Sequence, residues 1–109
     1  MNATVMTGTD GNFSNLVLNH PGPALVAFVA SWSGPCRLTN AAMQTVANES
    51  DSRVQFVKVD IDLCVQVADR HNLETIPAAI LFVNGCEVAR LPDAKKADQL
   101  RALLKEHVA

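Results

Sequence analysis

Three segments of the sequence are almost continuously apolar, and they constrain the fold more than any other feature. They are ALVAFVA (24–30), VQFVKVDI (54–61) and AAILFV (78–83). An apolar run of this length, bounded by turn residues, is typical of a strand that is buried on both faces of a sheet. Such a sheet needs helices on both faces, so the sequence predicts an α/β fold.

Amphipathic helices are predicted in the segments around these strands. Apolar residues recur at helical spacing in 35–49 and 95–107, and shorter helices are predicted in 9–20 and 63–72. The alternation of strands and helices indicates that at least part of the sheet is parallel, because parallel strands need long crossover connections.

Two further strands complete the predicted sheet. A short strand is expected at 3–7. Asn84 and Gly85 separate 78–83 from the segment CEVARL, and Asn-Gly suits the tight turn of an antiparallel hairpin. The sheet is therefore expected to be mixed.

The composition fits one compact domain over residues 1–109. The chain is 49% hydrophobic with a formal net charge of −2, and it has only nine Lys and Arg residues, so nucleic acid is not an expected partner. No signal peptide is expected in MNATVMTGTDGNF, and the apolar run 23–30 is far shorter than the roughly 20 residues that span a bilayer. We expect a soluble, cytoplasmic monomer with no membrane association.

The chain has three cysteines, Cys36, Cys64 and Cys86. A small, odd number of cysteines argues against a disulfide framework. The thiols are expected to be reduced. No Cys-x-x-Cys or Cys/His cluster occurs, so no metal site is expected, and no cofactor motif is present.

The segment Trp-Ser-Gly-Pro-Cys (32–36) joins a predicted buried strand to a predicted helix. Ser33 suits the N-cap of that helix, and Pro35 suits its first turn. A serine nucleophile needs a base, and no histidine is near in sequence, so a structural role is favoured for Ser33.

The chain resembles the thioredoxin family over nearly its whole length. The features that carry the resemblance occur in the family's order and spacing: ALVAFVASWSGPC, VKVDID, TIPAAILF, the Asn-Gly turn and the amphipathic last helix. The resemblance implies a thioredoxin fold, a five-stranded mixed sheet flanked by four helices. It also implies a cis peptide bond before Pro77, which would face the motif.

The same resemblance assigns positions to two residues of the motif. Ser33 stands where the family has its attacking cysteine, and Cys36 matches the shielded, resolving cysteine. Thiol–disulfide exchange needs a thiolate to attack and a second thiol to release the mixed disulfide. A serine hydroxyl cannot replace that thiolate, so the chain is predicted to be inactive as a protein-disulfide reductase.

Ala27 occupies the position of a buried acid that in the family helps to deprotonate the resolving cysteine. Lys58 matches the lysine that pairs with this acid. Because an unpaired buried ammonium is unfavourable, Lys58 is expected to reach solvent or another acid, such as Asp60 or Asp62.

Two further positions depart from the family. Val29 replaces a second tryptophan, and Asp93, after Pro92, replaces a glycine at the rim of the substrate groove. Pro92 and Asp93 are expected to stiffen and charge this rim.

Three functions remain open. The first is a redox-silent module that binds extended protein segments through a groove made by Trp32, Gly34, Pro35, Ile76 and Pro77. The second is an ordinary disulfide reductase in which the attacking cysteine was changed to Ser33 by engineering. The third is monothiol exchange or redox sensing through Cys36. The implied partners are protein substrates or clients, with glutathione or a thioredoxin reductase as further possibilities.

Overall fold

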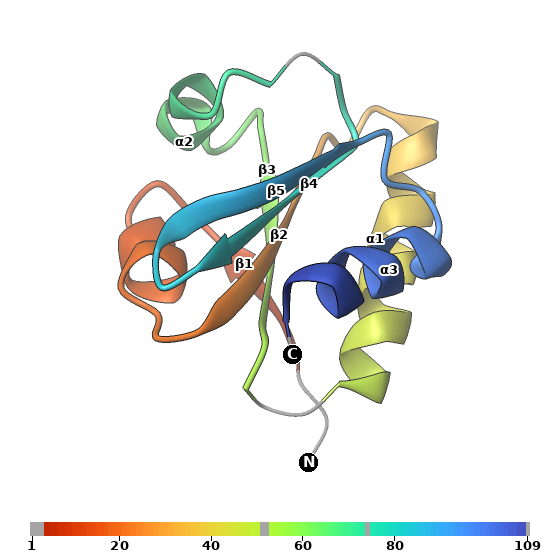
Figure 1. The fold of residues 1–109 in the computed structure, drawn as a ribbon. Coiled ribbons are helices and arrows are strands. Elements are labelled where there is room, and N and C mark those ends of the chain that lie inside the picture. Colours follow the sequence, from red (N-terminus) through yellow and green to blue (C-terminus); the bar gives the residue numbers. More distant parts are fainter. Residues whose placement is uncertain (1–3, 51–52, 74, 109) are drawn as a thin grey trace.

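A computed structural model describes residues 4–50, 53–73 and 75–108 (Figure 1). The elements follow one another along the chain as β1 (Val5–Gly8), η1 (Ser14–Leu18), β2 (Pro23–Val29), α1 (Gly34–Glu49), β3 (Gln55–Asp60), α2 (Val65–Arg70), β4 (Ala78–Val83), β5 (Cys86–Pro92) and α3 (Ala97–His107). The element η1 is a short π-helix.

The five strands form one sheet in the order β1-β3-β2-β4-β5. The strands β1, β3 and β2 are parallel, whereas β4 is antiparallel to β2 and β5 is antiparallel to β4. The prediction of a five-stranded mixed sheet with four helices is thus confirmed. Because β2 lies at the centre, its C-terminal end is flanked by both β3 and β4.

Helices cover both faces of the sheet, as the apolar strands required (Figure 1). The helices α1 and α3 lie on one face, and α2 and η1 lie on the other. Successive side chains of β2 alternate between two core clusters. Leu25 packs with Met43 and Leu100 in the first, and Phe28 packs with Phe82 in the second.

Three predicted helices are shorter in the structure than in the sequence pattern. In residues 9–20 the helical element is η1, and the side chains of Thr9 and Asn12 accept from each other's backbone N–H groups, at 3.1 and 2.6 Å, in the turn before it. The helix α2 has six residues. The helix α3 begins at Ala97 because Gln99 Oε1 accepts hydrogen bonds from the backbone N–H groups of Lys95 and Lys96.

The first residue of the predicted strand 3–7 lies outside the described residues, and β1 extends one residue further, to Gly8.

The turn between β4 and β5 has the predicted Asn-Gly geometry. Both Asn84 and Gly85 have positive φ, and a Cβ at Gly85 would lie 2.2 Å from the carbonyl oxygen of Leu18. Only glycine fits so close to another backbone segment. Beyond the turn, the register between β4 and β5 shifts between Leu81 and Phe82, which marks a β-bulge in the exposed edge strand β5.

Candidate functional site

Ser33 lies at the N-cap of α1, directly after the loop that leaves β2. Its backbone N–H donates to the carbonyl oxygen of Ala30 at 3.2 Å, and its own carbonyl oxygen accepts from the N–H of Cys36 at 3.2 Å. The Ser33 hydroxyl makes no side-chain capping hydrogen bond. Ser33 is nevertheless the N-cap residue of α1, as the sequence predicted, and its backbone is extended, as a cap requires.

Cys36 lies in the first turn of α1 and points into the core. Its side chain is 2% exposed, and Sγ accepts a hydrogen bond from the backbone N–H of Ala30 at 3.3 Å. Gly34 and Pro35 are exposed at the start of the same helix. The thiol is therefore shielded, while the backbone above it is open to solvent.

Trp32 is largely exposed to solvent. Its side chain is 70% exposed, and its indole N–H donates to Asp62 Oδ2 at 2.8 Å. Asp60 Oδ1 in turn accepts from the backbone N–H of Asp62 at 2.9 Å, which holds the turn after β3. The hydrogen bond to Asp62 thus orients the indole ring of Trp32, and the apolar face of the ring stays exposed to solvent.

The Ile76–Pro77 peptide bond is cis. Phe28 pairs with Ala78, so the buried Pro77 lies beside the C-terminal end of β2, where the motif begins. The carbonyl oxygen of Pro77 accepts from the backbone N–H of Asp93 at 2.9 Å.

Asp93 has φ of +58°, a left-handed conformation that glycine adopts most easily. The next residue is also fixed, because Thr39 Oγ1 of α1 donates to the carbonyl oxygen of Ala94 at 2.5 Å. The segment after β5 is therefore tied both to Pro77 and to α1, and it forms a rigid rim beside the motif.

A hollow of about 410 Å³, here called the tryptophan hollow, opens next to Trp32. It brings together two of the predicted site residues, Trp32 and Ile76, from segments that are far apart in the sequence. Ser33, Gly34, Pro35, Cys36 and Pro77 do not line it. Its remaining lining residues are Ile61, Ala68, Asp69, Asn72, Leu73 and Thr75.

A second hollow, of about 230 Å³, lies on the other side of the segment that follows α2 and is called here the edge hollow. Asn72, Leu73 and Thr75 line both hollows, so these residues form a ridge between them. The remaining lining residues of the edge hollow are Ala78, Arg90 and Pro92.

Lys58 lies on β3, beside β2, and lines a hollow of about 210 Å³. Asp60 and Asn40 line the same hollow. The side chain of Lys58 is half-buried, and the hollow reaches the surface. The ammonium is therefore not enclosed by apolar groups alone, as expected. On β2, Ala27 pairs with Lys58 and Val29 pairs with Asp60.

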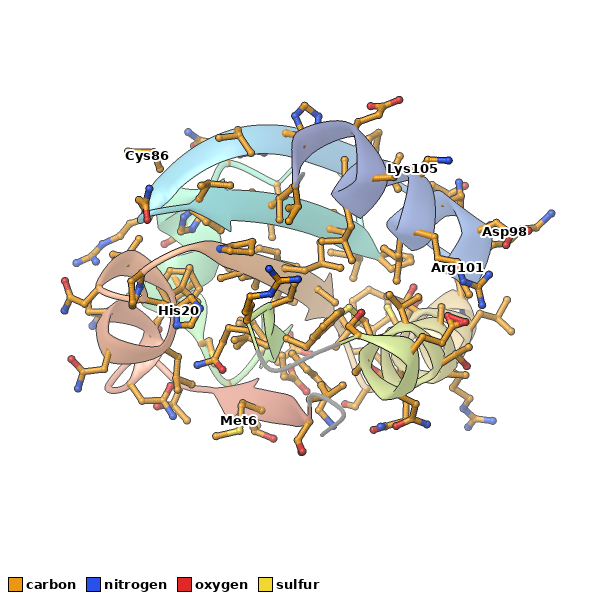
Figure 2. All side chains as sticks on the ribbon, turned by 60° about the horizontal axis from the view of Figure 1, so that its bottom comes forward. Met6, His20, Cys86, Asp98, Arg101 and Lys105 are labelled. Carbon is orange, nitrogen blue, oxygen red and sulfur yellow. The ribbon has the colours of Figure 1, made fainter. Side chains whose placement is uncertain are left out.

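The two cysteines outside the motif have contrasting surroundings. Cys64 is 2% exposed, and its thiol donates to the carbonyl oxygen of Gly8 at 3.3 Å. Burial raises the pKa of this thiol, and the nearby Asp10 carboxylate raises it further. Cys86 is exposed at the end of the β4–β5 hairpin, where Figure 2 shows it at the outer edge of the sheet.

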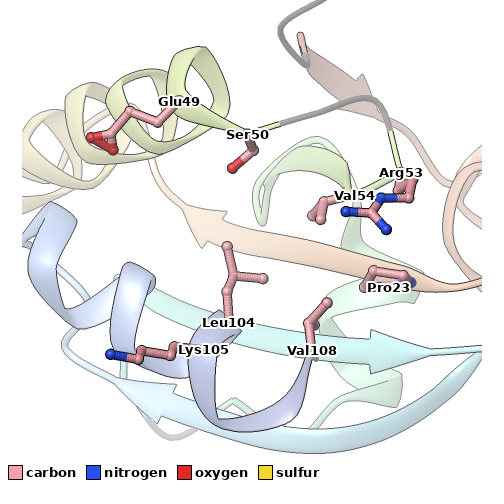
Figure 3. Close-up of a pocket in the computed structure, with 8 residues that line it drawn as sticks. All are labelled: Pro23, Glu49, Ser50, Arg53, Val54, Leu104, Lys105 and Val108. Carbon is pink, nitrogen blue, oxygen red and sulfur yellow. The ribbon is translucent and has the colours of Figure 1, made fainter.

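Another hollow, of about 430 Å³, has no part in this region (Figure 3). It is lined by Pro23, Glu49, Ser50, Arg53, Val54, Leu104, Lys105 and Val108. These residues come from the beginning of β2 and β3 and from the C-terminal ends of α1 and α3, whereas the motif follows the end of β2. Size alone therefore does not locate the functional region.

Comparison with known proteins gives a consistent result. The thioredoxin family model matches residues 4–106. The chain is 34% identical over 108 residues to thioredoxin C-2 of Corynebacterium nephridii, covering 99% of this chain and 100% of that protein.

The chain belongs to the thioredoxin family.

Other thioredoxins support the assignment. The thioredoxin of Mycolicibacterium smegmatis is 37% identical over 98 residues, with 87% of this chain and 88% of that protein covered. The solved structure of the Malassezia sympodialis thioredoxin shares the fold, with a TM-score of 0.84 at 20% identity, over 100% of this chain and 94% of that one. The thioredoxin fold is thus confirmed, and the family is one of thiol-disulfide oxidoreductases.

Several residues of this thioredoxin-family site were not predicted from the sequence. Ile61 could have been found, because it follows a buried strand at the same sheet edge as the motif. Asn72 and Leu73 carry no motif, and only the folded structure brings them together with Trp32.

Within the described residues, no group of three or more His, Cys, Asp or Glu side chains could hold a metal ion. In the same ranges, no helix has the length and apolar character needed to cross a membrane.

Proposed function

We propose that this protein is a redox-silent member of the thioredoxin family that binds extended protein segments. The observation that carries the proposal is the combination of Ser33 at the start of α1 with Cys36 at 2% exposure. Exchange requires an accessible thiolate and then a second thiol. The motif offers one thiol, and that thiol is shielded.

The surface around the motif supports the binding half of the proposal. Trp32 presents a largely free apolar ring, and Ile76 lies across the tryptophan hollow from it. Exposed aromatic residues beside a hollow are typical of binding hot spots. Gly34 and Pro35 form one rim of the proposed groove, and Pro77 supports the other.

A protein-disulfide reductase is the second candidate, since relatives across most of the chain are named thioredoxin. Gly34, Pro35, Cys36 and the cis Pro77 retain the rest of the dithiol framework. Under this candidate, Ser33 is an engineered replacement for cysteine and a thioredoxin reductase is a partner. Monothiol exchange with glutathione is less well supported, because Cys36 is buried.

The proposal also places the protein in the cytoplasm. All three thiols are unpaired, and unpaired thiols suit a reducing compartment.

Insulin reduction, driven by a small dithiol, tests the redox half. The protein should give no turnover above the reductant alone. Ser33→Cys should restore turnover, and Ser33→Cys with Ala27→Asp should raise it further, by up to ~10²-fold for a positioned base. Substantial turnover by the Ser33 protein would overturn the redox-silent proposal. Full activity in Ser33→Cys alone, with no gain from Ala27→Asp, would favour the reductase candidate.

Fluorescence of Trp32, the only tryptophan, tests the binding half. Reduced, alkylated insulin B chain serves as an extended polypeptide probe that cannot react with thiols. Saturable quenching is expected, and Ile76→Asp should abolish it. Val65→Asp is the matched control, because Val65 is 55% exposed but does not line the tryptophan hollow. Equal effects of the two substitutions would contradict binding at the groove.

A further inference from the structure

Arg90 of the edge strand β5 reaches the segment that follows α2. Its Nη1 donates to the carbonyl oxygen of His71 at 2.8 Å and to that of Asn72 at 3.4 Å. Its Nε and Nη2 donate to the two carboxylate oxygens of Glu87, at 3.0 and 2.9 Å. The guanidinium of Arg90 therefore links the Glu87 carboxylate to the backbone at the end of α2, where the ridge begins.

The geometry depends on the planar fork of arginine. Glu87 occupies one side of the fork in a bidentate pair, which fixes the plane of the guanidinium and aims Nη1 at His71. The two hydrogen bonds from Arg90 lower the pKa of the Glu87 carboxyl, so the pair is ionised at neutral pH. A lysine has one charged nitrogen and cannot make both sets of contacts.

The backbone that Arg90 holds leads directly into the ridge between the two hollows. The carbonyl oxygen of His71 belongs to the C-cap of α2, where helix carbonyls lack partners within the helix. Asn72 has φ of +47°, and there the chain turns from α2 toward Leu73. Since Asn72 and Leu73 line both hollows, the position of this turn sets the depth of each.

The other side of the same turn is anchored in the core. The ring of His71 lies 5.4–5.6 Å, centroid to centroid, from the rings of Phe13, Phe28 and Phe82. Its Nδ1 lies 2.8 Å from the carbonyl oxygen of Val67. The side chain of His71 is thus fixed by the core, whereas its carbonyl group is fixed by Arg90.

We propose that Arg90, oriented by Glu87, is a positioning residue for the bound segment, because it holds the ridge at the depth at which an apolar polypeptide can occupy the groove. The Arg90–Glu87 pair is neutral as a unit and its polar atoms are engaged. Arg90 lines the edge hollow and not the tryptophan hollow, so its effect on the bound segment passes through the ridge. This inference rests on the proposed binding function.

The test compares Arg90→Met, Arg90→Lys and Glu87→Gln with Arg101→Met. Arg101 is the matched control, since it makes a similar bidentate pair with Glu49, on α1 and α3, away from the ridge. Hydrogen exchange of the backbone amides of His71, Asn72 and Leu73 reports on the ridge. Trp32 quenching by reduced, alkylated insulin B chain reports on docking.

Arg90→Met should accelerate exchange at these amides and weaken docking about tenfold, the effect expected for losing hydrogen bonds from a charged donor. Arg90→Lys should recover part of the docking affinity, Glu87→Gln should have a smaller effect of the same sign, and Arg101→Met should change neither readout. Unchanged exchange and affinity in both Arg90→Met and Glu87→Gln would overturn the inference. If the unaltered protein does not bind the probe, the proposed binding function fails, and the exchange data alone decide whether Arg90 holds the ridge.

Discussion

At the scale of single residues, the three cysteines differ in how far their thiols are exposed to solvent. Cys36 and Cys64 are each 2% exposed and have backbone hydrogen-bond partners, whereas Cys86 is exposed at the hairpin. Burial also raises the pKa of Cys64, which lowers its thiolate fraction at neutral pH. Their reactivities should therefore differ.

We predict that a bulky maleimide labels Cys86 at least about tenfold faster than Cys36 or Cys64 in the native protein. The buried thiols react only after local opening, which is rare in a packed core. Mass spectrometry of peptides after brief labelling gives the rates. In concentrated denaturant the three rates should converge. Faster labelling of Cys36 would support the monothiol function instead.

Residue identity predicted some of the site and failed at other positions. The environment of Lys58 followed from the loss of an acid at Ala27, because an unpaired charge must reach water or another polar group. Ser33 was expected at the N-cap of α1 and lies there, but its hydroxyl makes no capping hydrogen bond. N-cap preference is a statistical tendency, and the rotamer of one exposed hydroxyl depends on neighbours that the sequence does not specify.

At the scale of elements, the segment between β5 and α3 is fixed by two hydrogen bonds to other parts of the chain. The buried Thr39 of α1 donates to the carbonyl oxygen of Ala94, and the N–H of Asp93 donates to Pro77. Both contacts join segments that are distant in the sequence, so this rim depends on α1 and on Pro77, the residue before β4.

Thr39→Val should lower the free energy of unfolding by about 1–3 kcal/mol, because it leaves the buried carbonyl oxygen of Ala94 without its partner. Thr45→Val is the matched control on the same helix. The exposed Thr45 hydroxyl bonds only the carbonyl oxygen of Ala41 in its own turn, so its loss should change stability by at most about 0.5 kcal/mol. Urea denaturation measures both. Similar losses for the two variants would show that the tie to Ala94 has no special importance.

Element boundaries were less predictable than element types. The three apolar segments became β2, β3 and β4 because continuous apolar sequence demands burial on both faces. The helix after Leu63 was predicted too long, since local periodicity does not reveal that the chain must turn at Asn72 to reach Pro77. At that turn His71 contacts Arg90 and Phe28, which are distant in the sequence.

At the scale of the whole molecule, two bidentate ion pairs connect or brace separate elements. Arg101 of α3 binds Glu49 at the end of α1 and also pairs with Asp98, and Figure 2 shows Arg101 and Asp98 together on α3. Arg90 pairs with Glu87 on β5. Hydrogen bonds from the arginines lower the pKa of Glu49 and of Glu87 below 4.5.

These shifts give the stability a defined dependence on pH. A carboxyl whose folded-state pKa is lowered contributes stability that is fully present above its unfolded pKa, near 4.5, and is lost as the pH falls through the folded value. The melting temperature should therefore fall as the pH drops below about 4.5. The Glu49→Gln/Glu87→Gln variant should show a shallower fall in differential scanning calorimetry, and 0.5 M salt should reduce the difference, because exposed pairs are screened. An equal fall in both proteins would assign the acid sensitivity to other groups.

The edge strand β5 also affects how copies of this protein behave at high concentration. Its outer backbone groups have no neighbouring strand in the sheet, and such an edge can template pairing with another molecule. The bulge opposite Leu81 and Phe82 interrupts a straight edge, Pro92 removes one N–H donor, and Glu87 and Arg90 place charges along it. An incoming strand would have to match an irregular register and desolvate an ion pair. This edge of the sheet is consequently protected against pairing with a strand of another molecule.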